Sequence, residues 1–386
     1  MKSHGIASNA DFGDQEAAMQ RYLQAGESRA YALGNRGPIR FDAEGKLDSK
    51  IIKSYWKHGF YIFENVLTLE ELEDIEADVE DILERLPTGR GSLVDSKGRP
   101  ALAADCSGRN LQWAKPLGDP IGGTKDNHGR HQIKMTEPQA SLDAPEEVVF
   151  VILGSLQFSE SCLRLYGHPD LLAVAETING KDFVPFNEAL FLKEPGRGAS
   201  VSWHQDGFTH WDSPNWTEGT HGFNFMAQLY GCTPANGLWV VPGTHKLGKL
   251  DITQMLREGE AERIPEAVPM VCAPGDVAIC NRQCVHGSFA NTSQDWRVTM
   301  NFGFHRKSSV LNVESGGIHN DVAIYDPRRI DERSRLIAYA INARQQRFSD
   351  EIPYVYKPFE GRMDNFKWDE AAQASIKDYN DLDMGI

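Results

Sequence analysis

Two kinds of hydrophobic spacing divide the chain, with helical spacing dominant early and alternation dominant later. Residues 59–63 form a short apolar run that predicts a buried strand. Thr68 and Glu71 follow in the pattern of a capping box, which starts a helix. Apolar residues then recur at helical spacing, and Pro87 predicts the end of this helix. The residues of its buried face are Leu72, Ile75, Val79 and Ile82.

Further along, the spacing changes from irregular to helical and then to a period of two. Residues 88–145 are rich in Gly, Asp and Lys and predict a long loop, and loops of that length are usually functional. Residues 145–178 are predicted to be mostly helical. From Val184 to Lys193 apolar and mixed positions alternate, as in a strand between two environments. Short strands are expected to continue to about residue 304, with one helix in the charged segment 251–265.

This order of elements predicts an α+β fold. Helices followed by many short strands favour a double-stranded β-helix, the cupin-like jelly roll, with flanking helices packed on one sheet. We assign residues 46–310 to this domain and residues 1–45 to a polar N-terminal arm or lid. Residues 311–386 are expected to be a C-terminal extension packed on the same domain, with a helix at 334–347.

Charge and cysteine content narrow the class of partner. The formal net charge is −15 over 386 residues, which disfavours nucleic acid and anionic membranes as partners and mildly favours a neutral or cationic small-molecule substrate. The first twenty residues lack the apolar stretch of a signal peptide, and we expect no membrane span because no apolar run is long enough to cross a bilayer. Its six cysteines form no CxxC pair, so we expect reduced thiols in a cytoplasmic protein. The oligomeric state stays open.

A candidate metal site follows from one short motif and one distant histidine. His204 and Asp206 are two residues apart in a predicted strand, so both side chains lie on the same face. Adding His286 gives two imidazoles and one carboxylate, the facial set typical of non-haem iron(II) oxygenases. Such a set leaves three coordination positions open. A bidentate 2-oxo acid can occupy two of them and dioxygen the third.

A predicted hairpin adds a candidate anchor for the 2-oxo acid. Residues 290–294 are a turn signal, and a turn between Thr292 and Ser293 would place Ser288 opposite Arg297. The planar fork of an arginine binds a carboxylate at two points. We therefore expect Arg297 to hold the far carboxylate of 2-oxoglutarate. The other face of its strand is apolar and suits packing against helices; it carries Trp296, Val298, Met300, Phe302 and Phe304.

Together with further motifs, these residues resemble the phytanoyl-CoA dioxygenase family of iron(II)- and 2-oxoglutarate-dependent oxygenases, over about residues 50–306. Besides His204, Asp206 and the pair Ser288 and Arg297 near His286, the matching stretches are residues 55–60 (YWKHGF), 236–245 (NGLWVVPGTH) and 274–276 (PGD).

The resemblance implies cofactors and site roles. Iron(II) would bind to His204, Asp206 and His286, with 2-oxoglutarate and dioxygen as co-substrates. Arg297 and Ser288 would bind 2-oxoglutarate, and looser motifs imply further contacts at Asn187 and Lys134. The products would be succinate, carbon dioxide and an oxidised metabolite. Because halogenating relatives lack the carboxylate found here at Asp206, hydroxylation of an unactivated C–H bond, or a desaturase or cyclase variant, is expected.

Two other classes of function stay open, as do the substrate contacts. Gln228, Trp239 and His210 are candidate substrate contacts, although core or surface positions explain each equally simply. A cupin-type metalloenzyme that does not use 2-oxoglutarate would share the fold but would not need Arg297. A non-catalytic binding protein would usually have lost an iron ligand.

Overall fold

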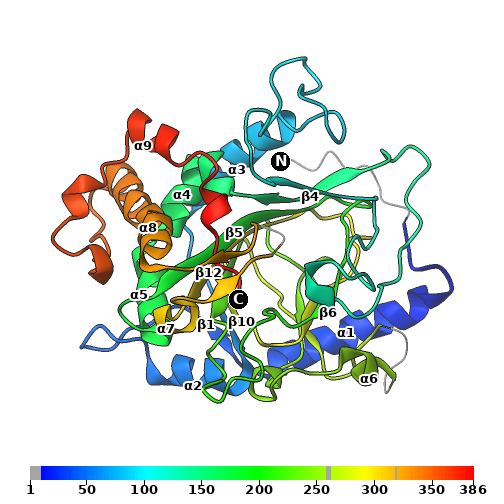
Figure 1. Cartoon of the computed structure of the whole chain (residues 1–386). Coiled ribbons are helices and arrows are strands. Elements are labelled where there is room, and N and C mark those ends of the chain that lie inside the picture. The colour runs from blue at the N-terminus through cyan, green and yellow to red at the C-terminus, as the bar shows by residue number, and fades with distance from the viewer. Residues whose placement is uncertain (1–9, 258–261, 318–319) are drawn as a thin grey trace.

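Two β-sheets face each other at the centre of the computed structural model, which describes residues 10–257, 262–317 and 320–386 (Figure 1). The larger sheet contains, in order across it, β1 (Arg36–Gly37), β2 (Phe60–Phe63), β10 (Val277–Asn281), β7 (Phe223–Gln228), β12 (Arg297–His305), β5 (Val184–Lys193), β4 (Val148–Leu153) and β3 (Leu111–Ala114). The smaller sheet contains β6 (Val201–His204), β11 (His286–Ser288), β8 (Trp239–Val240) and β9 (Val268–Pro269). A separate short pair joins β13 (Glu314–Ser315) to β14 (Ala323–Ile324).

The path of the chain between the two large sheets is that of a jelly roll. Strands β5, β7, β10 and β12 lie in the larger sheet, and β6, β8, β9 and β11 lie in the smaller one. The chain therefore crosses repeatedly from one sheet to the other and encloses a space between them. The predicted α+β class and double-stranded β-helix are confirmed.

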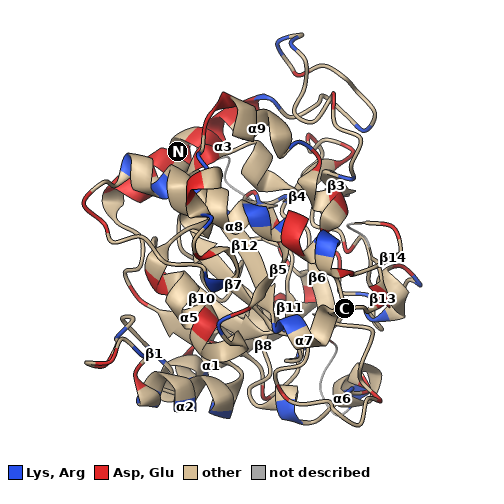
Figure 2. Ribbon diagram, turned by 60° about the vertical axis from the view of Figure 1, so that its left-hand side comes forward, with Lys and Arg blue, Asp and Glu red and all other residues tan. Residues whose placement is uncertain are grey.

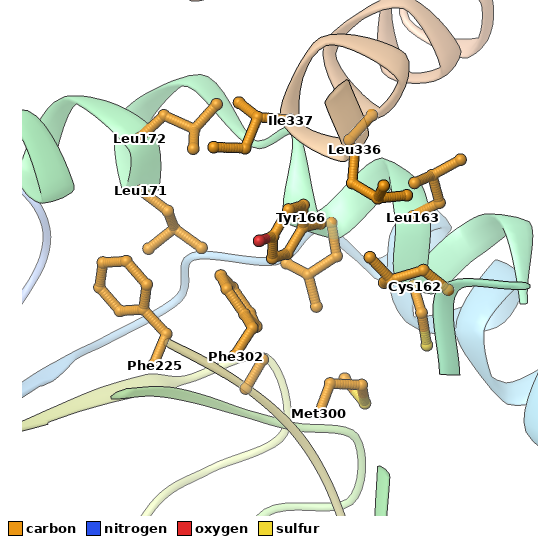
Figure 3. Close-up of a cluster of buried hydrophobic side chains, with 14 of the residues drawn as sticks. Cys162, Leu163, Tyr166, Leu171, Leu172, Phe225, Met300, Phe302, Leu336 and Ile337 are labelled. Carbon is orange, nitrogen blue, oxygen red and sulfur yellow. The ribbon is translucent and has the colours of Figure 1, made fainter. Parts of the chain in front are cut away.

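Four helices cover the outer face of the larger sheet: α3 (Leu69–Glu84), α4 (Glu160–Tyr166), α5 (Pro169–Asn179) and α8 (Pro327–Arg347) (Figure 1). Figure 3 shows Leu163 and Tyr166 of α4 and Leu336 of α8 above Met300 and Phe302 of β12. The apolar face expected for residues 296–304 is thus packed against helices, and the opposite face of β12 is left to line the interior.

The remaining helical segments are peripheral and mostly short. They are η1 (Gly13–Gln15), α1 (Glu16–Ala32), α2 (Ser49–His58), η2 (Asn127–Gly129), η3 (Ser155–Gln157), η4 (Thr244–Lys246), α6 (Ile252–Arg257), α7 (Lys307–Val310), η5 (Lys357–Phe359), η6 (Met363–Asn365), α9 (Glu370–Ser375) and η7 (Tyr379–Leu382). Across the described ranges, none of the helices combines the length and the apolar character needed to cross a bilayer.

Several predicted elements are confirmed by the structure. The helix α3 starts at the predicted capping box, in which Thr68 and Glu71 exchange hydrogen bonds. The strands β2 and β5 and the helix α8 lie where the periodicity placed them, and α6 lies within the charged segment. Part of that segment, residues 258–261, is outside the described residues.

Three predictions about local structure are wrong in part. The strand β4 lies inside the segment predicted to be mostly helical, because a continuous apolar run does not distinguish a buried strand from a buried helix. The strand β3 lies inside the predicted loop. The expected N-terminal arm contains the 17-residue helix α1; of this segment, residues 1–9 are outside the described residues.

Besides the helices that cover the larger sheet, helix α1 packs on the smaller sheet. The ring of Tyr22 stacks on that of Trp239 of β8, with 4.6 Å between the ring centroids. Gly26 faces the same indole so closely that a Cβ atom there would lie 2.2 Å from it. The absence of a side chain at Gly26 is what permits this contact.

Opposite charges join the C-terminal extension to the domain. Acidic residues lie along α3 (Figure 2), and arginines of α8 pair with them. The buried guanidinium of Arg344 lies 2.7 Å from the Glu71 carboxylate. Arg333, also in α8, pairs with Glu188 of β5 at 3.1 Å and with Asp383 at 2.8 Å. These pairs fix α8 and the last residues of the chain against the larger sheet.

Candidate active site

His204, Asp206 and His286 meet in the space between the two sheets. Because β6 and β11 pair antiparallel with His204 opposite His286, the two imidazoles lie next to each other. Asp206 follows β6 directly, and its carboxylate oxygens lie 3.5 Å from His204 Nε2 and 3.9 Å from His286 Nε2. All three side chains are buried, and their nearest donor atoms lie within 4.8 Å of one another. A single metal ion fits between them.

Hydrogen bonds orient both imidazoles. His204 Nδ1 donates to the carbonyl of Ser202 at 2.8 Å, and His286 Nδ1 donates to the carbonyl of Cys284 at 2.9 Å. Each ring therefore presents an unprotonated Nε2 toward Asp206. Burial lowers the pKa of His204 to about 4 and lowers the pKa of His286, so both rings are neutral at pH 7.

Asp206 is held by the buried Arg282 and the partly buried Arg130, neither of which the sequence indicated. Its carboxylate lies 3.2 Å from Arg130 Nη1 and 3.5 Å from Arg282 Nε, and it accepts a hydrogen bond from the Asn224 amide at 3.3 Å. Burial by itself would raise the pKa of Asp206, but Arg130 and the neighbouring cations bring it well below its usual range. The carboxylate is thus ionised and fixed in direction.

Arg297 and Ser288 lie at another part of the same space, but not in the predicted hairpin. Arg297 is paired with Lys193 of β5, and Ser288 with Val201 of β6, so the two residues belong to different sheets. The hairpin prediction is wrong because residues 289–296 cross from one sheet to the other instead of turning tightly. The two side chains nevertheless line one cavity.

This cavity has a volume of about 160 Å³, and His204, Asp206 and His286 form part of its wall. Its charged lining comprises Arg130, Arg282, Arg297 and Asp206, with neutral His131, His204 and His286. Most of the remaining wall is apolar, formed by Ile121, Phe150, Val151, Leu153, Phe186, Ala189, Phe191, Val201, Met226 and Leu238. An acidic protein therefore encloses a positively charged cavity.

Of the two further predicted contacts with 2-oxoglutarate, one residue lines the cavity and the other lies on the surface. Asn187 of β5 lines the cavity. Lys134 does not: more than half of its side chain is exposed, and its ammonium pairs with Glu137 at 3.0 Å. We therefore leave Lys134 out of the proposed binding set.

The three candidate substrate contacts all lie outside the cavity wall. Gln228 is one step behind it, where it accepts a hydrogen bond from Thr299, which does line the cavity. Trp239 is fully buried under α1, on the outer side of the smaller sheet. His210 contacts the carbonyl of Ser309 at 2.9 Å in a surface loop.

Sequence reasoning missed Arg130, His131, Arg282 and Lys193. The first two lie in the segment predicted as a functional loop, but nothing in its composition singles them out. Arg282 directly follows β10 and precedes His286 by four residues. This short distance in sequence was the signal that could have indicated it. Lys193 stands at the end of β5 on the face shared with Asn187, so alternation alone would have placed it facing the interior.

Comparisons with known proteins point to one family. The model of the phytanoyl-CoA dioxygenase family matches residues 55–299. L-proline trans-4-hydroxylase from Streptomyces griseoviridis is 29% identical over 117 residues, which cover 30% of this chain and 43% of the relative. Phytanoyl-CoA dioxygenase 1 from Oryza sativa subsp. japonica is 32% identical over 112 residues, which cover 26% of this chain and 37% of the relative. The match thus spans less than half the length of either curated relative.

Among solved structures, similarity extends to the crystal structure of EctD from S. alaskensis with 2-oxoglutarate and 5-hydroxyectoine. The TM-score is 0.49 at 18% sequence identity, and the match covers 72% of this chain and 83% of that one.

Proposed function

The chain belongs to the phytanoyl-CoA dioxygenase family, and from that premise we propose that it hydroxylates an unactivated C–H bond of a small-molecule metabolite, using iron(II), 2-oxoglutarate and dioxygen. Succinate and carbon dioxide are the co-products. The observation that carries this proposal is the meeting of His204, Asp206 and His286 in a cavity that also contains the buried guanidinium of Arg297.

The three ligands suit iron(II). Two neutral imidazoles and one ionised carboxylate would hold the metal and would leave room for a chelating 2-oxo acid and for dioxygen. When bound, the iron activates dioxygen by redox chemistry that no amino-acid side chain supplies. Arg130, Arg282 and Asn224 keep the Asp206 carboxylate in place, which preserves the geometry of the set while co-substrates enter.

Arg297 and Ser288 are proposed to bind the far carboxylate of 2-oxoglutarate. The guanidinium is oriented by Nε, which donates to Thr299 Oγ1 at 2.9 Å, and by Nη1, which donates to the carbonyl of Asn236 at 3.3 Å. No carboxylate from the described ranges pairs with it, so its charge is available to a ligand. Asn187 is a further candidate contact on the same wall.

The charge of the cavity favours a substrate with an anionic group. Its lining holds three arginines and one aspartate, and a divalent metal would add two positive charges while 2-oxoglutarate supplies two negative ones. The net charge of the whole chain, which pointed to a neutral or cationic substrate, is therefore a poor guide to the cavity. Arg130, close to Asp206, is the proposed contact for a carboxylate or phosphate group of a largely apolar substrate.

The other two classes of function have less support. A cupin-type metalloenzyme that does not use 2-oxoglutarate would have no use for Arg297 buried in the cavity. A non-catalytic binding protein would have no need for three intact ligands whose tautomers and charges are set for a metal. Hydroxylation is preferred to chlorination because Asp206 occupies the position that a chloride ligand would need.

Substrate-dependent release of succinate tests this proposal. The purified protein, loaded with iron(II), is incubated in air with 2-oxoglutarate and a panel of small carboxylic acids, each paired with its amide. We expect succinate formation that rises with at least one acid, exceeds that with the matching amide, and is lost in His204→Ala. Iron-independent succinate formation, or equal rates in wild type and His204→Ala, would contradict the proposal.

A further inference from the structure

Lys193 is a buried lysine beside the proposed carboxylate site that none of the roles above explains. It is the last residue of β5, and its Cα is paired with that of Arg297 at the start of β12. Opposed residues of an antiparallel pair project from the same face of the sheet. Lys193 and Arg297 therefore both point toward the smaller sheet, and each is at most 3% exposed.

The ammonium of Lys193 reaches across to the smaller sheet. Its Nζ donates to Ser288 Oγ at 2.9 Å and to the carbonyl of Phe289 at 2.5 Å. Both acceptors belong to β11 or follow it directly. Lys193 does not itself line the cavity, whereas Ser288 and Arg297 do. It thus stands directly behind Ser288, as seen from the cavity.

Two buried basic side chains lie side by side here. Within the ranges that the structure describes, no ion pair is formed by Lys193 or Arg297, and their contacts are hydroxyls and carbonyls. Asp119 is the acidic group whose charge acts on Lys193, but its carboxylate is occupied by the backbone amides of Gly122 and Met135. Buried, unpaired charges cost several kcal/mol each, as an order of magnitude. Such a pair is stabilised when an anion binds between the sheets.

The hydrogen bond from Lys193 also decides the direction of the Ser288 hydroxyl. A serine hydroxyl has one proton to donate and two lone pairs that accept. Since Ser288 Oγ accepts from Lys193, its proton is free to point into the cavity, toward Arg297's side of the site. A hydroxyl fixed in this way is a donor, which is the role a carboxylate requires.

We propose that Lys193 is a positioning residue for the co-substrate, which orients the Ser288 hydroxyl and adds a second positive charge where the far carboxylate of 2-oxoglutarate binds beside Arg297. This inference rests on the proposed function, because it assumes that 2-oxoglutarate is the ligand. It adds that the site selects a 2-oxo acid with a second carboxylate over one without.

Calorimetric titration of the iron(II)-loaded protein without oxygen tests the proposal. The probes are 2-oxoglutarate and 2-oxobutyrate, which share the chelating end but differ in the far carboxylate. In Lys193→Met, which keeps the length of the side chain, we expect the Kd for 2-oxoglutarate to rise about 10- to 100-fold, because the Ser288 hydroxyl loses its orientation and the site loses a nearby positive charge. The Kd for 2-oxobutyrate should change less than about twofold, since that ligand makes no contact at this end.

Lys134→Met is the matched control, because it removes an exposed lysine that pairs with Glu137 outside the cavity. It should leave both dissociation constants unchanged. A purely structural role for Lys193 would weaken the two ligands equally, and that result would overturn the proposal. So would an unchanged Kd for 2-oxoglutarate in Lys193→Met. If the wild-type protein binds neither ligand, the proposed function itself fails.

A double variant and the pH dependence keep the proposal testable if Lys193→Met loses stability. Because Lys193 acts through Ser288, the effects of Lys193→Met and Ser288→Ala on the Kd should be less than additive.

Burial, and next Arg297, lower the pKa of Lys193 well below its usual value, with Asp119 opposing them. In the wild type, affinity for 2-oxoglutarate should then fall as the pH rises past that pKa. In Lys193→Met this pH dependence should be absent. Fully additive effects, or the same pH profile in both proteins, would contradict the positioning role.

Discussion

At the scale of single residues, the direction of each metal ligand is set by a neighbour rather than by the ligand itself. Asp206 lies between Arg130 and Arg282, and each imidazole donates from Nδ1 to a backbone carbonyl. The guanidinium of Arg282 is itself fixed, since it stacks 3.8 Å from the ring of Phe186 and donates to the carbonyl of His221. The geometry needed for metal binding is therefore present in the fold.

The variant Arg282→Met tests the positioning of Asp206. It keeps an apolar contact with Phe186 but removes the cation 3.5 Å from the carboxylate. We expect the affinity for iron(II) to fall about 10- to 100-fold, as is typical when the partner of a metal ligand is lost. Competition with a chelator of known affinity measures it. Arg328→Met, at an exposed position of α8, is the control, and equal affinities in the two variants would contradict the account.

Arg297→Ala tests the proposed contact with the co-substrate. Loss of the buried guanidinium should raise the KM for 2-oxoglutarate about 10- to 100-fold, because charge-assisted hydrogen bonds to a carboxylate are lost. The kcat at saturating 2-oxoglutarate should change much less. Initial rates of succinate formation measure both constants. An unchanged KM for 2-oxoglutarate would remove Arg297 from the binding site.

At the scale of secondary-structure elements, the sequence predicted where strands form better than it predicted which strands pair. Alternation along residues 184–193 and 297–304 predicted two strands and their buried faces, because a period of two is a local property. The pairing of those strands is not local. The turn signal at residues 290–294 predicted a hairpin. Arg297 instead pairs with Lys193, which belongs to a strand about a hundred residues earlier in the chain. Alternation put Lys193 on the interior face, but it could not show that Lys193 lies beside Arg297.

The contact between α1 and the smaller sheet gives a prediction at the same scale. Gly26→Ala should raise intrinsic helix propensity by about 1 kcal/mol in α1. A Cβ atom at this position would nevertheless lie 2.2 Å from the fully buried indole of Trp239. We therefore expect a net loss of stability of about 1–3 kcal/mol, as for overpacking. Chemical denaturation measures it, with Gly89→Ala as the control because that position has open space around it. A more stable Gly26→Ala variant would contradict the packing described.

At the scale of the whole molecule, charge is unevenly distributed between surface and interior. Acidic residues gather along α3 (Figure 2), whereas the charged residues of the cavity are mainly arginines. The sequence predicted the fold and the meeting of His204, Asp206 and His286, because spacing and a few motifs carry that information. It did not predict the sign of the cavity charge, since Arg130, Arg282 and Arg297 are brought together only by the folded chain.

Buried neutral histidines make the folding stability depend on pH. Burial, and next Arg344, lower the pKa of His168 to about 3, and burial lowers the pKa of His221 to about 4, both from 6.5. Between pH 6.5 and these values the unfolded chain binds protons that the native protein does not. Stability is therefore complete above pH 6.5 and is lost as the pH falls, by up to about 1.4 kcal/mol per pH unit for each histidine.

Urea denaturation of the metal-free protein at pH 7.5 and pH 5.5 checks this. We expect a lower free energy of unfolding at pH 5.5, and a smaller difference in His168→Gln, which cannot take up a proton. Equal free energies at the two pH values would show that these histidines are not buried in the neutral form.

The visible absorption spectrum under anaerobic conditions tests the central claim most directly. If His204, Asp206 and His286 hold iron(II) with two adjacent positions free, adding iron(II) and 2-oxoglutarate together should produce a weak charge-transfer band from the chelate. Neither addition alone should produce it, and His204→Ala should lack it while remaining folded. A folded wild-type protein that binds iron(II) but develops no such band with 2-oxoglutarate would contradict the account.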